Sequence, residues 1–399
     1  MDPYITEWLN LLVRLLHVVA AIAWIGASFY FIALDYTLRP PADARDAERG
    51  VGGETWEVHG GGFYRVEKFR VAPATLPERL TWFKWEAYTT WLSGFVLLVV
   101  LYYLNPNTYL IDRSVAALDP LPAVAISIGI LAIGWLVYDG LCRLLEHNDR
   151  LLSIVLGLIV IGVSFGASLV FAPRAVYIQV GSLLGTWMAA NVFFVIIPGH
   201  WDLVRAKQAG TEVDPKPGLR GKQRSIHNNY LTLPAIFAML SNHFPMTYGH
   251  DQGWLILVVI MAVLVAVRHF FNLRHQGRTV WAIPAGAAAA MALLAVLIAP
   301  PADTASVDES APPVAFETVQ GIIELRCQTC HSEDPTHEGF TAPPLGVAFD
   351  TPEQIQAQAE RIEQMAVITK AMPLGNVTGM TDDERQTLGT WIRQGAKLE

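Results

Sequence analysis

The sequence has 399 residues and a net charge of −8; 52% of its residues are hydrophobic and only 16% are charged. Soluble proteins average roughly 25% charged residues, so this chain carries more apolar surface than a soluble core needs. These values exclude an ordinary soluble protein. They indicate that most of the chain lies in a lipid bilayer. No nucleic-acid partner is expected.

Residues 1–299 are predicted to form an all-α, polytopic transmembrane bundle of about eight spans. A helix needs about 20 mostly apolar residues to cross a bilayer. The sixth of the eight candidate stretches is the weakest, because it contains three asparagines and a proline. The candidate spans are 9–33, 82–104, 122–142, 151–171, 176–197, 228–244, 254–271 and 280–299.

Basic residues predict the orientation, since cytoplasmic loops carry an excess of Lys and Arg. The loops after the first, third, fifth and seventh spans are rich in them, and Arg268 is counted in the last of these. The opposite loops hold only Arg113 and Arg174. Both termini are therefore expected in the periplasm of a bacterial inner membrane. The loop 34–81 is long, and loops of that length are usually functional or disordered.

Ionisable groups inside a bilayer are costly, so each is a candidate for function. His17 lies among Leu and Val residues of the first span, which favours a role as a ligand or proton relay. His243 lies at the outer end of the sixth span. Three further candidates lie on the cytoplasmic side: His59, His200 and His227. For these, a role as ordinary polar residues of the membrane interface explains their position at least as well as a functional role.

A second cluster, Trp82-Phe83-Lys84-Trp85-Glu86, stands at the start of the second span. Tryptophans are common at membrane interfaces, and Lys84 could extend its amine to the surface. Glu86 lies deeper and is harder to explain in this way. A Lys/Glu pair among aromatic rings would suit a flat anionic heterocycle.

The remaining sequence predicts a linker, 300–315, and a small soluble domain, 316–399. The linker is rich in Pro, Ala, Ser and acidic residues and should be extended. Residues 301–399 contain 6 Lys/Arg and 16 Asp/Glu, a net charge of 6 − 16 = −10. An acidic, polar segment after an apolar one indicates a soluble domain on a membrane anchor.

Cys327-Gln328-Thr329-Cys330-His331 is the attachment motif of a c-type haem. Its two thiols bind the haem covalently and the histidine binds the iron. A zinc site would need a second pair of ligands, and only His337 is near. The remaining cysteine, Cys142, is interpreted as a small buried apolar residue.

The second axial ligand of such a haem is often a methionine. Met372 is the predicted ligand, since it lies in a loop-like stretch before Pro373. Met365 falls in a helical run and is better placed for the core. Met380 precedes Thr381, which with Glu384 forms a capping box that opens the last helix, so Met380 fits a packing role.

Together these stretches resemble the membrane-bound cytochrome c urate oxidase (urate hydroxylase) family, over essentially the whole chain. Residues 315–399 resemble class I cytochrome c domains, which that family carries at its C-terminus. The body of the chain carries the likeness in five segments: 59–64 (HGGGFY), 82–95 (WFKWEAYTTWLSGF), 198–200 (PGH), 225–230 (SIHNNY) and 241–245 (SNHFP).

The resemblance implies oxidation of urate to 5-hydroxyisourate in purine breakdown. Electrons would leave through haem c to a soluble cytochrome c or a terminal oxidase, without hydrogen peroxide. The expected substrate site lies toward the cytoplasm and contains Lys84, Glu86, His59, His200 and His227. Two alternatives stay open: a dehydrogenase of quinol or another substrate with the same haem outlet, and a membrane-tethered electron shuttle without catalysis.

A substrate site on the cytoplasmic side would leave electrons about 30 Å of bilayer to cross. That distance requires a relay. His17 and His243 both fall toward the outer surface, and neutral imidazole pairs are good haem ligands. We therefore predict a b-type haem held by His17 and His243. The alternative is that urate is oxidised from the periplasmic side, close to haem c.

Overall fold

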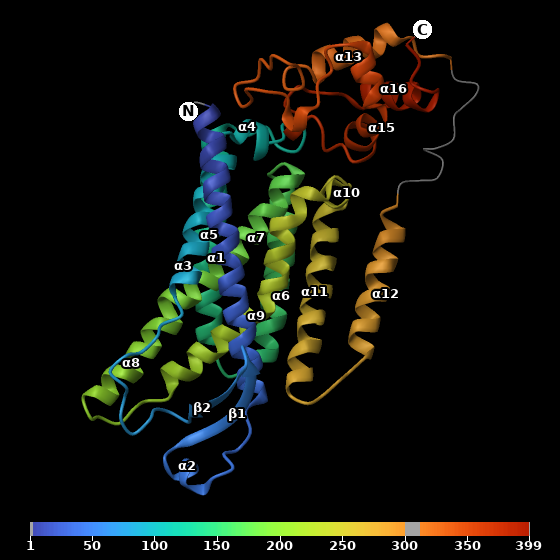
Figure 1. The fold of residues 1–399 in the computed structure, drawn as a ribbon. Helices are drawn as coiled ribbons and strands as arrows, with labels where there is room; N and C mark the ends of the chain where they lie inside the picture. Colours follow the sequence, from blue (N-terminus) through green and yellow to red (C-terminus); the bar gives the residue numbers. More distant parts are fainter. Residues whose placement is uncertain (1–2, 300–311, 399) are drawn as a thin grey trace.

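The computed structural model describes residues 3–299 and 312–398 (Figure 1). Residues 3–299 form a bundle of helices that lie side by side. Residues 312–398 form a smaller, mostly helical C-terminal unit across one end of that bundle. The N-terminus lies at the same end, and a β-hairpin projects from the opposite end, here called the hairpin end. Most of the predicted linker, 300–311, lies outside the described residues.

Besides the four-residue helix α10 (Pro245–Tyr248), the bundle contains ten helices of the described chain, and two of them continue into π-helical turns. These turns are Val99–Tyr103, after α3, and Asn191–Ile196, which joins α7 to α8. The helices are α1 (Pro3–Thr37), α3 (Trp85–Leu98), α4 (Pro106–Tyr109), α5 (Pro120–Leu144), α6 (Asp149–Ser168), α7 (Pro173–Ala190), α8 (Ile197–Gln208), α9 (Lys216–Leu240), α11 (Gly253–His275) and α12 (Ala282–Leu297).

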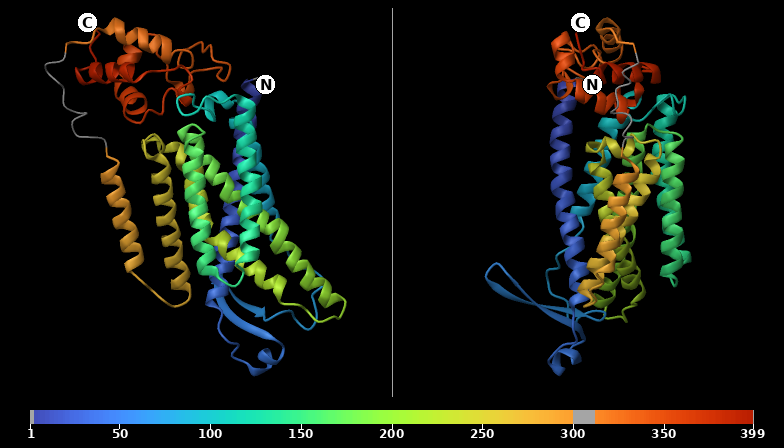
Figure 2. Two further views of the ribbon diagram at one scale, coloured as in Figure 1. Left: turned by 180° about the vertical axis from the view of Figure 1, so that it is seen from behind. Right: turned by 90° about the vertical axis from the view of Figure 1, so that its right-hand side faces the viewer.

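Six helical segments of the described chain are long and apolar enough to cross a membrane, against the eight predicted. The fifth runs from Pro173 to Gln208 and is longer than its predicted span, 176–197. The sixth predicted span falls in α9, which ends at Leu240 and is too polar to qualify. The eighth falls in α12, which is apolar but short. Both helices nevertheless stand beside the others in the bundle (Figure 2).

α7 is the central helix of the bundle, and most of its side chains are buried. Trp187 of α7 stacks on Tyr138 of α5, with ring centroids 4.6 Å apart. Gly181 lets α9 approach closely, because a Cβ there would stand 2.4 Å from that of Ala238. Close packing around α7 therefore allows α9, with its polar side chains, to be held inside the bundle.

The all-α class fits the mostly helical structure, and the loop 34–81 adds a β-hairpin to it. Strand β1 (Val51–His59) pairs antiparallel with β2 (Gly62–Phe69). Gly60 and Gly61 form the two-residue turn, both at positive φ (57° and 81°), which matches the turn that two-residue hairpins favour. A short helix, α2 (Ala44–Glu48), lies beside the hairpin.

The C-terminal unit has its own hydrophobic core. Its helices are α13 (Phe316–Arg326), α14 (Pro352–Ala357), α15 (Ala359–Ile362) and α16 (Asp382–Arg393). The first ends at the cysteine motif, and Thr381 and Glu384 form the predicted capping box of α16. The predicted capping box is confirmed. The buried core includes Phe316, Val319, Ile323, Ile355, Leu388 and Trp391.

The two units touch backbone to backbone. A Cβ at Gly375 would stand 2.7 Å from the Ile111 carbonyl oxygen of the bundle, and one at Gly249 would stand 1.9 Å from the Thr369 oxygen of the C-terminal unit. Ala371 packs against the core of the bundle. Glycine is therefore required on both sides of this contact.

Candidate functional site

The predicted substrate residues Lys84 and His200 come together at an aromatic cluster near the hairpin end. Trp82 is its centre and stacks on Trp201 of α8, with ring centroids 4.3 Å apart. The His200 ring lies 6.4 Å from Trp82. The Lys84 amine lies 6.0 Å from the Trp82 ring and 5.5 Å from that of Trp85, within cation–π range. The cluster therefore places the Lys84 ammonium group beside the flat faces of tryptophan rings.

The other two predicted substrate residues at this end, Glu86 and His59, lie in different environments. Glu86 is half-buried in the first turn of α3, two residues after Lys84, and its carboxylate has no hydrogen-bond partner among the described residues. His59 ends β1 at the tip of the hairpin, opposite Gly62, and is exposed. Since the hairpin projects from the bundle (Figure 2), His59 does not join the aromatic cluster.

His227 lies in a different place, between α5, α7 and α9. Asn191 Nδ2 donates to the Tyr138 hydroxyl at 2.8 Å, and that hydroxyl lies 2.8 Å from His227 Nδ1, to which it can donate. Cys142 lies 3.9 Å from the same nitrogen and is buried, as predicted. The network is internally satisfied. It borders a cavity of about 190 Å³ that Cys142 lines.

His17 is fixed in one orientation but faces a methionine. Its Nδ1 lies 2.9 Å from the Thr90 carbonyl oxygen, to which it can donate, and this leaves Nε2 free, as in a metal ligand. Nε2 lies 3.3 Å from the Met239 sulfur. The Met239 side chain therefore occupies the space in front of Nε2, where the iron of a haem would have to lie.

His243 lies in a 3₁₀ turn after α9, four residues beyond Met239, and is exposed. No described contact joins it to His17. The two side chains therefore do not fit a b-type haem held by both histidines. That second haem stays a prediction.

Sequence reasoning missed a polar cluster on α9 and α11. Asn229 Oδ1 accepts from Arg268 Nε and from Asn272 Nδ2, each at 2.9 Å. Arg268 is 4% exposed and therefore not in a cytoplasmic loop, where the orientation argument counted it. Its position within the apolar stretch 254–271 was the available signal, because charges inside spans are functional candidates.

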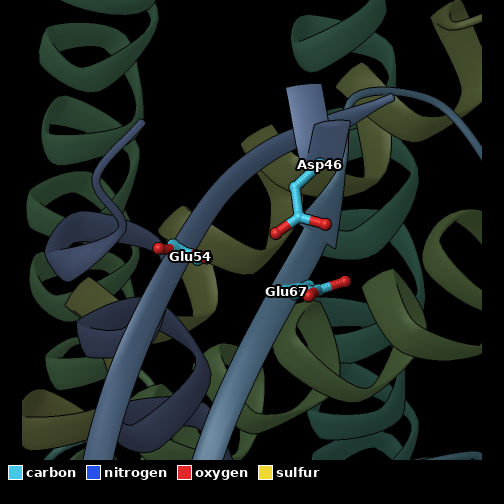
Figure 3. A group of neighbouring side chains, drawn as sticks. All are labelled: Asp46, Glu54 and Glu67. Atoms are coloured by element: carbon cyan, nitrogen blue, oxygen red, sulfur yellow. The ribbon is translucent and has the colours of Figure 1, made fainter. Parts of the chain in front are cut away.

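Three carboxylates, Asp46, Glu54 and Glu67, gather at the base of the hairpin (Figure 3). Two arginines, rather than a metal ion, pair with them. Arg65 forms ion pairs with all three, and Arg49 pairs with Asp46 at 2.7 Å and with Glu67 at 3.4 Å. This group is a structural ion-pair network that ties α2 to the hairpin.

The haem-attachment motif follows α13 directly. The backbone nitrogens of Cys330 and His331 both donate to the Cys327 carbonyl, at 3.2 and 2.9 Å, and both thiols are free. His331 Nδ1 lies 2.9 Å from the Val347 carbonyl oxygen, to which it can donate, leaving Nε2 available to iron. Burial lowers the pKa of His331 and favours the neutral ring that binds metals. These residues fit a covalent haem.

The methionines of the C-terminal unit differ in burial. Met380 is 4% exposed and belongs to the core, which fits the predicted packing role. Met372 is half-buried and packs at the edge of the same core, as Cys327 does. Of these two, only Met372 has a side chain that is not already enclosed in the core.

Comparison with known proteins adds one finding. The model of a family described as Urate oxidase N-terminal matches residues 3–299, which is the whole described bundle. The match ends before the C-terminal unit. Searches of curated proteins and of solved structures returned no match.

Proposed function

Since the chain belongs to the urate oxidase N-terminal family, we propose that its bundle oxidises urate to 5-hydroxyisourate and that electrons leave through a haem c in the C-terminal unit. The family match over residues 3–299 is the observation that carries the substrate. The free thiols of Cys327 and Cys330, next to an oriented His331, support the electron outlet.

The reaction balances as urate plus water giving 5-hydroxyisourate, two protons and two electrons. Haem c, when bound, would supply a one-electron acceptor. Cys327 and Cys330 would hold it through thioether bonds, and His331 and Met372 would bind its iron. Because each urate yields two electrons, a one-electron acceptor would pass them on one at a time to a soluble cytochrome c or a terminal oxidase.

The bundle offers two places for a planar anion. In the aromatic cluster, Lys84 would hold the negative charge and Trp82 would stack on the ring. Glu86 or His200 would accept a proton as electrons depart. The second place is the polar cluster of Arg268. His227, bonded to Tyr138, is better suited to passing protons than to contacting the ring.

We also propose that the chain lies in a bacterial inner membrane with the C-terminal unit in the periplasm. The six apolar helical segments support a membrane location. The N-terminus lies at the same end as the C-terminal unit (Figure 1), as an even number of crossings requires. Haem c is normally attached outside the cytoplasm, which agrees with this orientation.

The deciding experiment follows haem c absorbance in purified membranes given urate, quinol or no donor. Reduction by urate alone, without hydrogen peroxide, is the expected result. Reduction by quinol but not urate would favour a different dehydrogenase. Reduction by neither donor, with haem c still reducible by dithionite, would favour a tethered electron shuttle.

A further inference from the structure

The buried polar atoms that lack a hydrogen-bond partner are concentrated in one place. Five such side-chain atoms occur among the described residues, and four lie on α9 and α11. Buried polar groups are almost always paired, because an unpaired one costs about 1–3 kcal/mol. The four atoms are Arg268 Nη2, Asn229 Nδ2, Asn272 Oδ1 and His275 Nδ1.

Arg268 also lacks a counter-ion. No carboxylate pairs with it among the described residues, although it is 4% exposed. Arg224, which is 3% exposed, shows the usual solution: its guanidinium pairs with Asp139 at 2.8 Å. A buried charge without a partner is strongly destabilising, and more so at membrane depth. An anion beside Arg268 would supply the missing charge.

The free atoms specify the hydrogen-bonding groups that such an anion needs. The Phe29 ring lies under the guanidinium, 3.9 Å from Cζ, and holds its plane. Asn229 Oδ1 binds both Arg268 and Asn272, so the three side chains are fixed together. Two donors, on Arg268 and Asn229, and one acceptor, on Asn272, remain unpaired.

We propose that Arg268, Asn229 and Asn272 form the recognition site for the urate anion, which deepens the proposed function and rests on it. Urate is planar and carries both carbonyl oxygens and ring N–H groups, so it can satisfy the donors and the acceptor together. A simple carboxylate has no hydrogen to donate to Asn272 Oδ1. Beside the site, the Tyr230 hydroxyl bonds His269 Nδ1 at 2.7 Å, and the exposed His269 offers a route for released protons.

The new site is separate from the aromatic cluster. Phe29 of α1 contacts Arg268, whereas Phe31 contacts Phe83 beside Lys84, with ring centroids 4.9 Å apart. Residues two apart on a helix point about 200° apart, so α1 stands between the two places. α11, which carries Arg268 and Asn272, lies toward the edge of the bundle, next to α12 (Figure 1).

The test is binding of radiolabelled urate to purified full-length protein kept reduced with dithionite, so that no turnover occurs. Asn272→Asp is the most informative variant. It places a carboxylate one helical turn from Arg268, on the same face of α11. Arg268 is then neutralised within the protein. The fold should hold, and urate affinity should fall at least tenfold.

Arg268→Lys gives a second result that does not depend on Asn272, since it keeps the charge and removes the planar donors. It should also bind urate at least tenfold more weakly. Arg274→Gln, on an exposed arginine of the same helix, is the matched control and should bind like the unchanged protein. Gel filtration and the haem c spectrum show whether each variant is folded.

The outcomes separate this inference from the proposed function. If the unchanged protein neither binds urate nor reduces haem c with it, the proposed function fails and the urate site fails with it. If it does both, and a folded Asn272→Asp or Arg268→Lys variant binds urate normally, the function stands and the Arg268 site is wrong. Loss of binding in Lys84→Gln alone would then place the ring in the aromatic cluster.

Discussion

At the scale of single residues, the environment decides between roles that the sequence leaves open. Arg224 and Arg268 are both buried arginines, but only Arg224 has a carboxylate partner. His17, predicted from its position in an apolar stretch, faces a methionine, whereas His227, at the cytoplasmic start of the sixth predicted span, is bonded to Tyr138. Spacing along one helix could not predict these contacts, because each partner comes from another helix.

The attachment motif gives the most direct prediction. Replacing both Cys327 and Cys330 with alanine should abolish covalent haem, because both thioether bonds are lost. Haem-linked peroxidase staining after denaturing electrophoresis measures this. Cys142→Ala removes a buried thiol far from the motif and should retain the stain. A full-length band that still stains in the double variant would refute the haem c assignment.

Burial separates the two methionines. Met372→Ala should abolish the methionine–iron absorption band near the red end of the spectrum while haem stays attached. Met380→Ala should keep the band but lower the free energy of unfolding by about 2–5 kcal/mol, as expected for truncation in a core, because Met380 is 4% exposed. Spectra and denaturant titrations of both variants check this, and the reverse pattern would assign the iron to Met380.

The second haem is testable without mutation. The prediction from His17 and His243 is that acid–acetone removes one haem from purified active protein and leaves haem c bound. The structure adds a condition, since Met239 must move away from His17 Nε2. Met239→Ala should therefore not reduce the extractable haem. A haem-to-protein ratio of one, with nothing extractable, would exclude this haem.

At the scale of elements, the apolar helices were predictable and the exceptions have physical causes. α9 is polar along its buried face because Arg224, Asn228 and Asn229 find partners inside the bundle. The mean hydropathy of a segment does not depend on whether its polar side chains are paired, so it could not identify α9 as a helix of the bundle. The hairpin had a readable signal, since Gly60-Gly61 between two strand-like stretches is typical of a tight β-turn. The length of the segment 34–81 had suggested an irregular loop instead.

The ion-pair network predicts how the hairpin responds to acid. Hydrogen bonding to Arg65 and to Arg49 lowers the pKa of Asp46 below its ordinary value of 3.8. A lowered carboxyl pKa stabilises the fold above the unfolded-state value and loses that effect as pH falls through the folded-state value. Proteolysis of the hairpin should therefore increase below pH 3.8, with the helices still protected. Asp46→Asn should be cleaved readily at neutral pH as well; equal protection of both proteins at pH 7 would contradict this role.

At the scale of the whole molecule, the position of the C-terminal unit connects the two proposed halves of the reaction. The segment Thr369–Gly375 includes Met372, and its ends meet the bundle at Gly249 and Ile111. This contact directs one side of the predicted haem site toward the bundle. The sequence predicted a soluble domain on an extended linker, and it could not predict docking, because the contact depends on two glycines far apart in the chain.

Docking through Gly375 should control the electron outlet. A Cβ there would stand 2.7 Å from the Ile111 oxygen, and such overpacking costs about 1–3 kcal/mol, which lowers the docked fraction roughly 5- to 150-fold. Gly375→Ala should therefore slow urate-dependent reduction of haem c within that range and leave reduction by dithionite unchanged. Gly379→Ala introduces similar strain, at φ +67°, but has only Arg326 nearby, at 3.8 Å, and should keep the normal rate. Stopped-flow absorbance distinguishes the two variants; equal rates would mean that electrons reach haem c without this contact.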